Sequence, residues 1–181
     1  EWRTSSAICA NPAIGRFVDR LVAGGGTAIV SETAEFLGAE EVVRGRCESP
    51  AVAQAILARL AAEEALMHGE GIDYRGVNPT EENIEAGLTT LTEKTMGAVC
   101  KIGTSRFAGC LDFAEAPPCP GLHFMDTPFF SCTSLAGMVL GGAQAALFAM
   151  GVFNPAGMPL APVYKVCGNP VTLQRWGTEI D

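Results

Sequence analysis

The sequence predicts an α/β domain with a mainly parallel sheet, helices on both faces and a Rossmann-like arrangement. Short apolar runs, the expected strands, alternate with longer segments in which apolar residues recur at helical spacing. These short runs are apolar along their whole length, which is typical of parallel strands that are covered on both faces. Polar or glycine-rich segments follow several of the runs. In folds of this class, ligands bind outside the carboxyl ends of the strands.

The first expected helix begins at Asn11, which we predict to be its N-cap, with Pro12 at the first helical position. Its apolar residues recur three and four positions apart and form one face: Ile14, Phe17, Val18, Leu21 and Val22. Glycines at 24–26 end this helix, and residues 27–30 are expected to form a short buried strand. Helix, glycine turn and strand together make one half of an α/β unit.

The remaining elements continue this alternation. Helices are expected over residues 35–45, 50–67, 90–102, 135–140 and 171–176, and strands over residues 106–113, 121–125, 145–150 and 162–166. The composition of residues 68–83 predicts a loop of about 16 residues. A loop of this length exceeds ordinary connections, so we expect it to be a functional loop or a lid.

Length and charge limit the class of protein. The chain of 181 residues fits a single α/β domain over residues 1–181, and we expect it to be a piece of a longer protein because it begins at Glu1 rather than Met. A net charge of −8 and a pI near 4.8 argue against nucleic acid or an anionic membrane surface as a partner. No apolar run reaches the roughly 18 residues that a membrane-spanning helix needs.

The seven cysteines are scattered, and no two of them form a C-x-x-C pair. We interpret them as free thiols in a reducing compartment, which predicts a cytoplasmic protein. An iron–sulfur site built from Cys100, Cys110 and Cys119 is an alternative, although their spacing matches no compact cluster motif. Zinc is less favoured still, because the only histidines are His68 and His123. We expect His123, within a strand, to be a core residue.

Polar residues follow four of the expected strands, as Ser31-Glu32-Thr33, Asp126-Thr127-Pro128, the loop that starts at Gly151, and Gly168-Asn169. Glu32 and Asp126 are candidate catalytic residues and candidate oxygen ligands of a divalent metal ion, either Fe²⁺, Mn²⁺ or Mg²⁺. The structural alternative for each is a carboxylate that complements the start of the next helix. Thr33, Thr127 and Asn169 are candidate substrate-binding residues.

The segment GLTTLTEKTMGAV, residues 87–99, forms the start of a helix. A capping box accounts for Thr90 and Glu93, in which the threonine caps the helix and the glutamate reaches back. Thr89, Thr90 and the adjoining N–H groups are candidates for binding a substrate carboxylate or hydroxyl. Lys94, one turn further along, is the best candidate base, and a surface lysine is the alternative.

Several segments together resemble the altronate/galactarate dehydratase family, and more narrowly its large carboxyl-terminal catalytic region. They are ANPAIG near the start, SETAEFLGAEEVV, NPTEENIEAGLTTLTEKTMGAVCKIGTS, MDTP and the ending PVYKVCGNP. The resemblance implies a lyase that dehydrates altronate- or galactarate-type sugar acids with a divalent metal, usually iron. One relative cleaves sulfite from sulfolactate instead. The resemblance also implies a small anionic substrate, and either a homo-oligomer or a partner small subunit or domain.

Two segments depart from the family pattern. Where many members have Thr-Thr-Gly-Arg-Gly, this chain has Ala149-Met150-Gly151-Val152-Phe153, without the arginine that would hold a substrate carboxylate. MDTP is followed by Phe129-Phe130 instead of a glycine and an aromatic residue. A sulfolactate sulfo-lyase and a non-catalytic sugar-acid-binding domain therefore stay open as alternatives.

Overall fold

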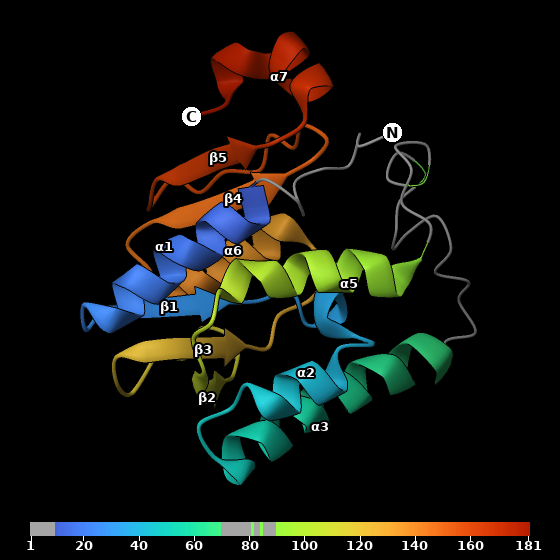
Figure 1. Ribbon diagram of the computed structural model, residues 1–181, viewed down its shortest axis with the longest axis vertical. Helices are drawn as coiled ribbons and strands as arrows, with labels where there is room; N and C mark the ends of the chain where they lie inside the picture. Colours follow the sequence, from blue (N-terminus) through green and yellow to red (C-terminus); the bar gives the residue numbers. More distant parts are fainter. Residues whose placement is uncertain (1–9, 70–80, 82–83, 85–89) are drawn as a thin grey trace.

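The computed structural model describes residues 10–69, 81, 84 and 90–181 (Figure 1). Its helices are α1 (Asn11–Ala23), α2 (Glu40–Gly45), α3 (Pro50–Gly69), α5 (Leu91–Val99), α6 (Ser131–Leu140) and α7 (Pro170–Trp176). The 3-10 helices are η2 (Thr33–Phe36), η3 (Cys100–Ile102) and η4 (Gly177–Glu179). The strands are β1 (Thr27–Val30), β2 (Phe107–Leu111), β3 (Gly121–Met125), β4 (Ala146–Met150) and β5 (Val163–Cys167).

The described strands form two sheets, both parallel. One has the order β1-β3-β2, and the other pairs β4 with β5. The predicted α/β class and the parallel pairing are confirmed. The sheet is divided, however: β4 and β5 lie beside each other and apart from the larger sheet (Figure 1). The Rossmann-like arrangement stays a prediction.

Strand β3 lies in the middle of the larger sheet, and all five of its residues are buried. Phe124 on this strand meets Phe36 and Phe107 edge to face, with ring centroids 5.5 and 6.2 Å away. Ile56 and Leu60 of α3 complete this core beneath the sheet. The carboxyl ends of strands β1 and β3, after which the polar residues begin, are thus fixed by a well-packed aromatic core.

Several predicted elements differ in detail from the observed ones. The expected helix over 35–45 is a 3-10 turn followed by the short helix α2, because Gly38 between them has a φ of 85°. The helix expected over 90–102 changes from α to 3-10 at Cys100. Asn11 is not an N-cap. Ala10 takes that position, and the Asn11 side chain donates instead to the Gly97 carbonyl, 2.8 Å away.

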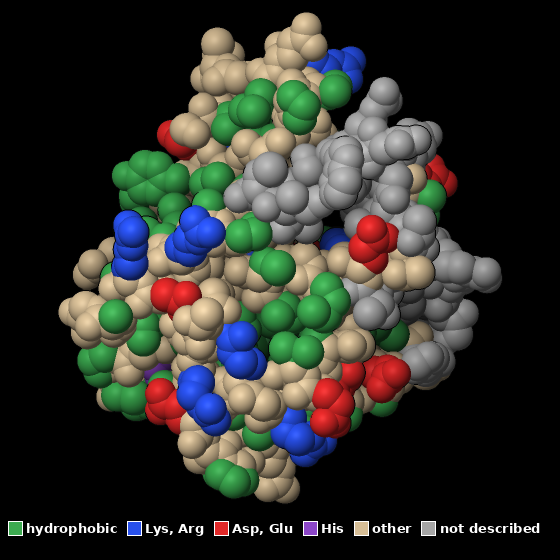
Figure 2. All heavy atoms as spheres, viewed as in Figure 1, with side chains coloured by type: hydrophobic (Ala, Val, Ile, Leu, Met, Phe, Trp, Pro, Cys, Tyr) green, Lys and Arg blue, Asp and Glu red, His purple; other side chains and the backbone are tan. Residues whose placement is uncertain are grey.

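His123 is fully buried in β3, as the sequence predicts. Its Nε2 lies 2.9 Å from the carbonyl oxygen of Cys119, which is the acceptor of this bond. In the described part of the chain, no helix is both long and apolar enough to cross a membrane. Lys and Arg side chains are interspersed with Asp and Glu over the face shown in Figure 2.

Helix α1 crosses η3 at very short range through two glycines. A Cβ on Gly15 would lie 2.3 Å from the Cys100 carbonyl oxygen and 2.8 Å from the backbone of Gly103. Gly103 itself has a φ of 60° and faces the Gly15 carbonyl. The close contact brings the end of α5 and η3 against α1, and it therefore fixes the helix face that carries Lys94 and Lys101.

Replacing Gly15 by alanine is expected to lower the free energy of unfolding by about 2 kcal/mol, since backbone atoms must separate to admit the methyl group. Gly45→Ala is the matched control, because a Cβ there would meet no atom within 4 Å. It should change stability by less than about 1 kcal/mol, in the stabilising direction. Urea unfolding followed by circular dichroism measures both. Equal stability of the two variants would contradict the close packing of α1 on η3.

Candidate functional site

A cleft of 1610 Å³ runs between the two sheets. Strand β1 lines one side and β4 the other, while α1, α5 and α6 complete the wall. Most of the lining is apolar. The polar side chains gather where β1 and β4 end, from Glu32 on one side to Asn154 on the other. This matches the rule that ligand sites in open α/β sheets lie beyond the carboxyl ends of the strands.

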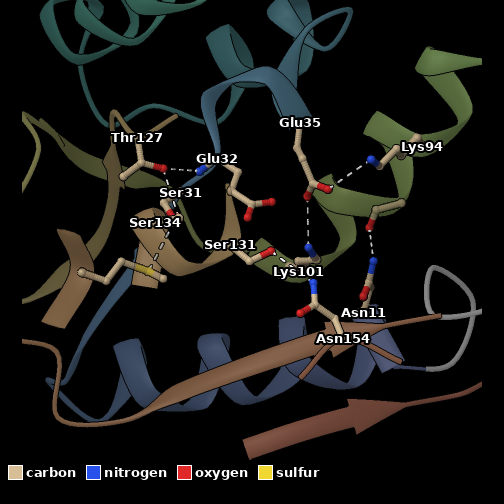
Figure 3. A network of polar contacts seen from close by, with 12 residues as sticks. Asn11, Ser31, Glu32, Glu35, Lys94, Lys101, Thr127, Ser131, Ser134 and Asn154 are labelled. Carbon is tan, nitrogen blue, oxygen red and sulfur yellow. Dashed lines mark hydrogen bonds and ion pairs between the residues drawn. The ribbon is translucent and has the colours of Figure 1, made fainter. Parts of the chain in front are cut away.

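Four charged side chains meet in this cleft, and we call Glu32, Glu35, Lys94 and Lys101 the charged cluster (Figure 3). Glu35 holds the centre. Its Oε1 lies 3.7 Å from Lys94 Nζ, and its Oε2 lies 3.2 Å from Lys101 Nζ. Both glutamates come from the turn after β1, and both lysines come from one side of α5 and η3. The cluster therefore joins two segments that are about sixty residues apart in the sequence.

Burial and mutual charge set the protonation of the cluster. Burial alone raises the pKa of Glu35, but the positive charges of Lys101 and Lys94 outweigh it and lower that pKa below its ordinary value. Burial alone lowers the pKa of Lys101, but Glu35 and Glu32 raise it above its ordinary value. Glu35 and Lys101 thus form a partly buried pair that stays charged.

For the other two members of the cluster, Glu32 and Lys94, the surroundings favour the uncharged form of the side chain. Burial, and then the charge of Glu35, raises the pKa of Glu32 to about 7, against the opposing effect of the two lysines. Burial lowers the pKa of Lys94, and the two glutamates offset this only in part. Lys94 Nζ also lies 4.7 Å from the centre of the Phe129 ring. A carboxyl group that titrates near neutral pH and a lysine with a lowered pKa are suited to proton transfer.

The backbone at Glu32 adopts a left-handed conformation, with φ 68° and ψ 80°. This is uncommon for a residue with a side chain. Its N–H donates to Thr127 Oγ1 at 2.9 Å, and Thr127 Oγ1 is also bonded to Ser134 Oγ at 3.0 Å. The parallel pairing of β1 with β3 brings this turn beside the segment that follows β3.

Glu32 and Asp126 do not face the same space. The Asp126 carboxylate accepts a hydrogen bond from Thr33 Oγ1 at 2.6 Å and lies 3.8 Å from Arg59 Nε of α3. Glu32 instead lines the cleft beside Glu35 and the two lysines. Their neighbouring strand ends bring the two residues close in the fold, but their side chains have different partners.

The predicted substrate-binding residues lie in three different places. Thr33 and Thr127 are buried and do not line the cleft. The Thr33 hydroxyl donates to Asp126 and accepts the N–H of Thr127. Thr90 caps α5 by accepting from the Glu93 N–H at 3.1 Å, which confirms this half of the capping box. Asn169 caps α7 and also donates to the Gly151 carbonyl at 3.0 Å. Thr89 lies outside the described residues.

Sequence reasoning missed Glu35 and Lys101, and it gave no role to Ser131 or Asn154. Ser131 begins α6, and its Oγ lies 3.5 Å from Asn154 Nδ2 across the cleft. One signal was available: Lys94 and Lys101 are seven residues apart, so they share one face of a helix. Glu35 follows Glu32 by three positions, the spacing of neighbours in a helical turn.

The described residues supply an incomplete donor set for a metal ion. Within them, no three His, Cys, Asp or Glu side chains lie close enough together to hold one. Both oxygens of Glu35 face ammonium groups, and the oxygens of Asp126 face Thr33 and Arg59. Glu32 and Glu93 are the other described acidic residues that line the cleft, and Glu32 is the one in the charged cluster. The six described cysteines are free thiols, as predicted, while Cys9 lies outside the described residues.

Comparisons with known proteins show the family of this chain. The model of the family D-galactarate/altronate dehydratase, C-terminal, matches residues 3–181. The (2R)-sulfolactate sulfo-lyase subunit beta of Chromohalobacter salexigens is 37% identical over 100% of this chain and 47% of its own length. The altronate dehydratase of Escherichia coli is 30% identical over 91% of this chain and 33% of its own length. The galactarate dehydratase (L-threo-forming) of the same organism is 28% identical over 94% of this chain and 32% of its own length.

The chain thus spans about half the length of the sulfo-lyase subunit and a third of the length of the dehydratases. The segments that carry the resemblance in sequence include the two that supply the charged cluster: SETAEFLGAEEVV with both glutamates, and the segment of α5 and η3 with both lysines. The chain belongs to the D-galactarate/altronate dehydratase family and corresponds to its C-terminal region.

Proposed function

We propose that this chain is the catalytic region of a lyase that acts on a small 2-hydroxy acid and eliminates a group from the carbon beta to the carboxylate. The observation that carries the proposal is the charged cluster in the cleft, where Glu32 and Lys94 are both shifted toward neutrality. Such a pair suits a reaction that removes one proton and delivers another near pH 7.

In the proposed reaction, Lys94 is the base. Its neutral amine takes the proton from the alpha carbon, and the electron pair of that C–H bond forms the double bond as the beta group leaves. For a sugar acid of altronate or galactarate type, the leaving hydroxide takes a proton from the Glu32 carboxyl group and departs as water. The enol product then tautomerises to a 2-keto acid. Lys101, kept charged by Glu35, offsets the negative charge that develops on the substrate carboxylate.

The second candidate is cleavage of a beta sulfonate, with sulfite as the leaving group. It is favoured by the relative in Chromohalobacter salexigens, whose 37% identity extends over the whole chain. The first step, removal of the alpha proton, is the same in both reactions. Sulfite departs with the electron pair of the C–S bond and needs no proton from Glu32. Glu32 therefore matters more for dehydration than for sulfite release.

The experiment is an assay of the full-length protein with altronate, galactarate and (2R)-sulfolactate. Formation of a 2-keto acid with release of water supports the dehydratase, and release of sulfite supports the sulfo-lyase. Binding of one of the acids by calorimetry without any turnover would support a non-catalytic sugar-acid-binding domain and contradict the lyase proposal.

A divalent metal, Fe²⁺ first and Mn²⁺ or Mg²⁺ as alternatives, remains part of the proposal. Glu32 would hold it as an ionised carboxylate, and the metal would then replace the Glu32 proton in stabilising the leaving hydroxide. We expect metal analysis of active full-length protein to find a divalent ion, and chelation to abolish turnover while the circular dichroism spectrum is unchanged. Full activity in protein shown to be free of metal would contradict this. A partner subunit is also proposed, since the sulfo-lyase relative is named as a beta subunit.

A further inference from the structure

The turn at Glu32 is held by an unusual set of hydrogen bonds. Thr33 and Thr127 bond to each other twice: Thr33 N–H donates to the Thr127 carbonyl, and Thr127 N–H donates to Thr33 Oγ1, both at 3.2 Å. Thr33 Oγ1 donates in turn to Asp126 Oδ1 at 2.6 Å. Thr127 Oγ1 accepts the N–H of Glu32 at 2.9 Å. These four bonds cross-link the ends of strands β1 and β3.

The two threonines of this set are buried, whereas the Asp126 side chain is 34% exposed. Thr33 is fully buried and Thr127 is 3% exposed. Neither residue lines the cleft, and neither does Asp126, whereas Glu32 does. The left-handed backbone of Glu32 costs energy in a residue with a side chain, so it persists only where its surroundings impose it. The bond from the Glu32 N–H to Thr127, and the two bonds between Thr127 and Thr33, impose this conformation.

We propose that Asp126, Thr33 and Thr127 form a clamp that holds Glu32 in its left-handed conformation, with its carboxyl group in the cleft, and that Asp126 acts on the reaction through Glu32 alone. The effect on the reaction rests on the proposed function. In this arrangement Asp126 is a positioning residue, the acceptor that fixes the direction of the Thr33 hydroxyl. Thr33 Oγ1 then presents a lone pair to the Thr127 N–H.

Paired variants of the full-length protein test the clamp. Thr33→Val keeps the shape of the side chain but loses the hydroxyl, and Thr33→Ser retains it. Asp126→Leu loses the acceptor, while Asp126→Asn retains an oxygen acceptor without the negative charge. The measurements are kcat and KM on the acid that the protein turns over, and a crystal structure of each variant.

We expect Thr33→Val and Asp126→Leu to lower kcat by about 10- to 100-fold, because a catalytic group displaced by an ångström or so loses that much. KM should change much less. Thr33→Ser and Asp126→Asn should restore most of the lost kcat. In the crystal structures, Glu32 should leave the left-handed region only in the first two variants.

The two readouts separate the possible failures. If Glu32 keeps its backbone and its place beside Lys101 in both Thr33→Val and Asp126→Leu, the clamp is overturned, whatever the activity. If Asp126→Asn loses activity while Glu32 stays in place, Asp126 acts directly, for example as a metal ligand, and the proposal is overturned. If Glu32 moves and kcat does not change, the clamp stands and the catalytic role of Glu32 is wrong.

Discussion

Replacing Lys94 by alanine is expected to lower kcat by a factor of roughly 10²–10⁴, the contribution of a positioned base to proton transfer. Lys94 is the lysine of the charged cluster whose pKa is lowered by burial, so it gives up its proton more readily than Lys101, whose pKa is raised. Its Nζ lies over the Phe129 ring and 3.7 Å from Glu35. The protein should stay folded and still bind substrate, since Glu35 keeps Lys101 as a partner.

Lys94→Arg is the matched control for this prediction. An arginine keeps the positive charge but does not lose its proton at any accessible pH. If Lys94 is the base, the arginine variant should be as slow as the alanine variant. If Lys94 only attracts an anionic substrate, arginine should restore kcat, and alanine should raise KM. Initial rates over a range of substrate concentrations, with thermal melts as a check on folding, distinguish these two results.

The second prediction concerns the pH dependence of stability. Glu32→Gln is expected to raise the free energy of unfolding by about 3 kcal/mol at pH 8 and to leave it unchanged near pH 4. In the folded protein, the pKa of Glu32 is raised from 4.5 to about 7, so the folded state binds this proton more tightly than the unfolded state. The wild-type protein therefore loses stability as pH rises from about 4.5 to about 7. Glutamine does not ionise in this range, so the stability of the variant does not fall for this reason.

The measurement is urea unfolding of both proteins at half-unit steps between pH 4 and pH 8.5. The difference between the two curves cancels the titrating groups outside the charged cluster, and it reports Glu32 together with its electrostatic coupling to Glu35, Lys94 and Lys101. A variant that is less stable than wild type at pH 8 would show that the charged carboxylate is favoured in the fold. The lysines, not burial, would then dominate the environment of Glu32.

Local patterns predicted most of the elements but not how they meet. Residues 27–30 and 121–125 are strands with the expected bounds because short apolar runs leave little choice. Asn11 was placed wrongly because its preference for an N-cap gave way to a long-range bond with Gly97. The division of the strands into two sheets depends on which strands pair, and periodicity within a segment carries no information about that.

The candidate site shows the same limit. Glu32 stood out because it follows a buried strand, and Lys94 because it follows a helix cap. Glu35 and Lys101 are separated by 66 positions, and only the packing of η2 against α5 and η3 brings them together. Asp126 and Glu32 were predicted as a pair from the adjacency of strand ends. Side-chain direction after a strand depends on backbone angles such as the positive φ of Glu32, which composition does not reveal.

The division into two sheets has a consequence for hydrogen exchange. Amides of β3, paired on both sides and wholly buried, should exchange only when the whole domain unfolds. The β4–β5 pair is half exposed and has two described strands, so its amides should exchange through a local opening of lower free energy. Because β4 forms one wall of the cleft and β1 the other, such an opening widens the cleft from one side.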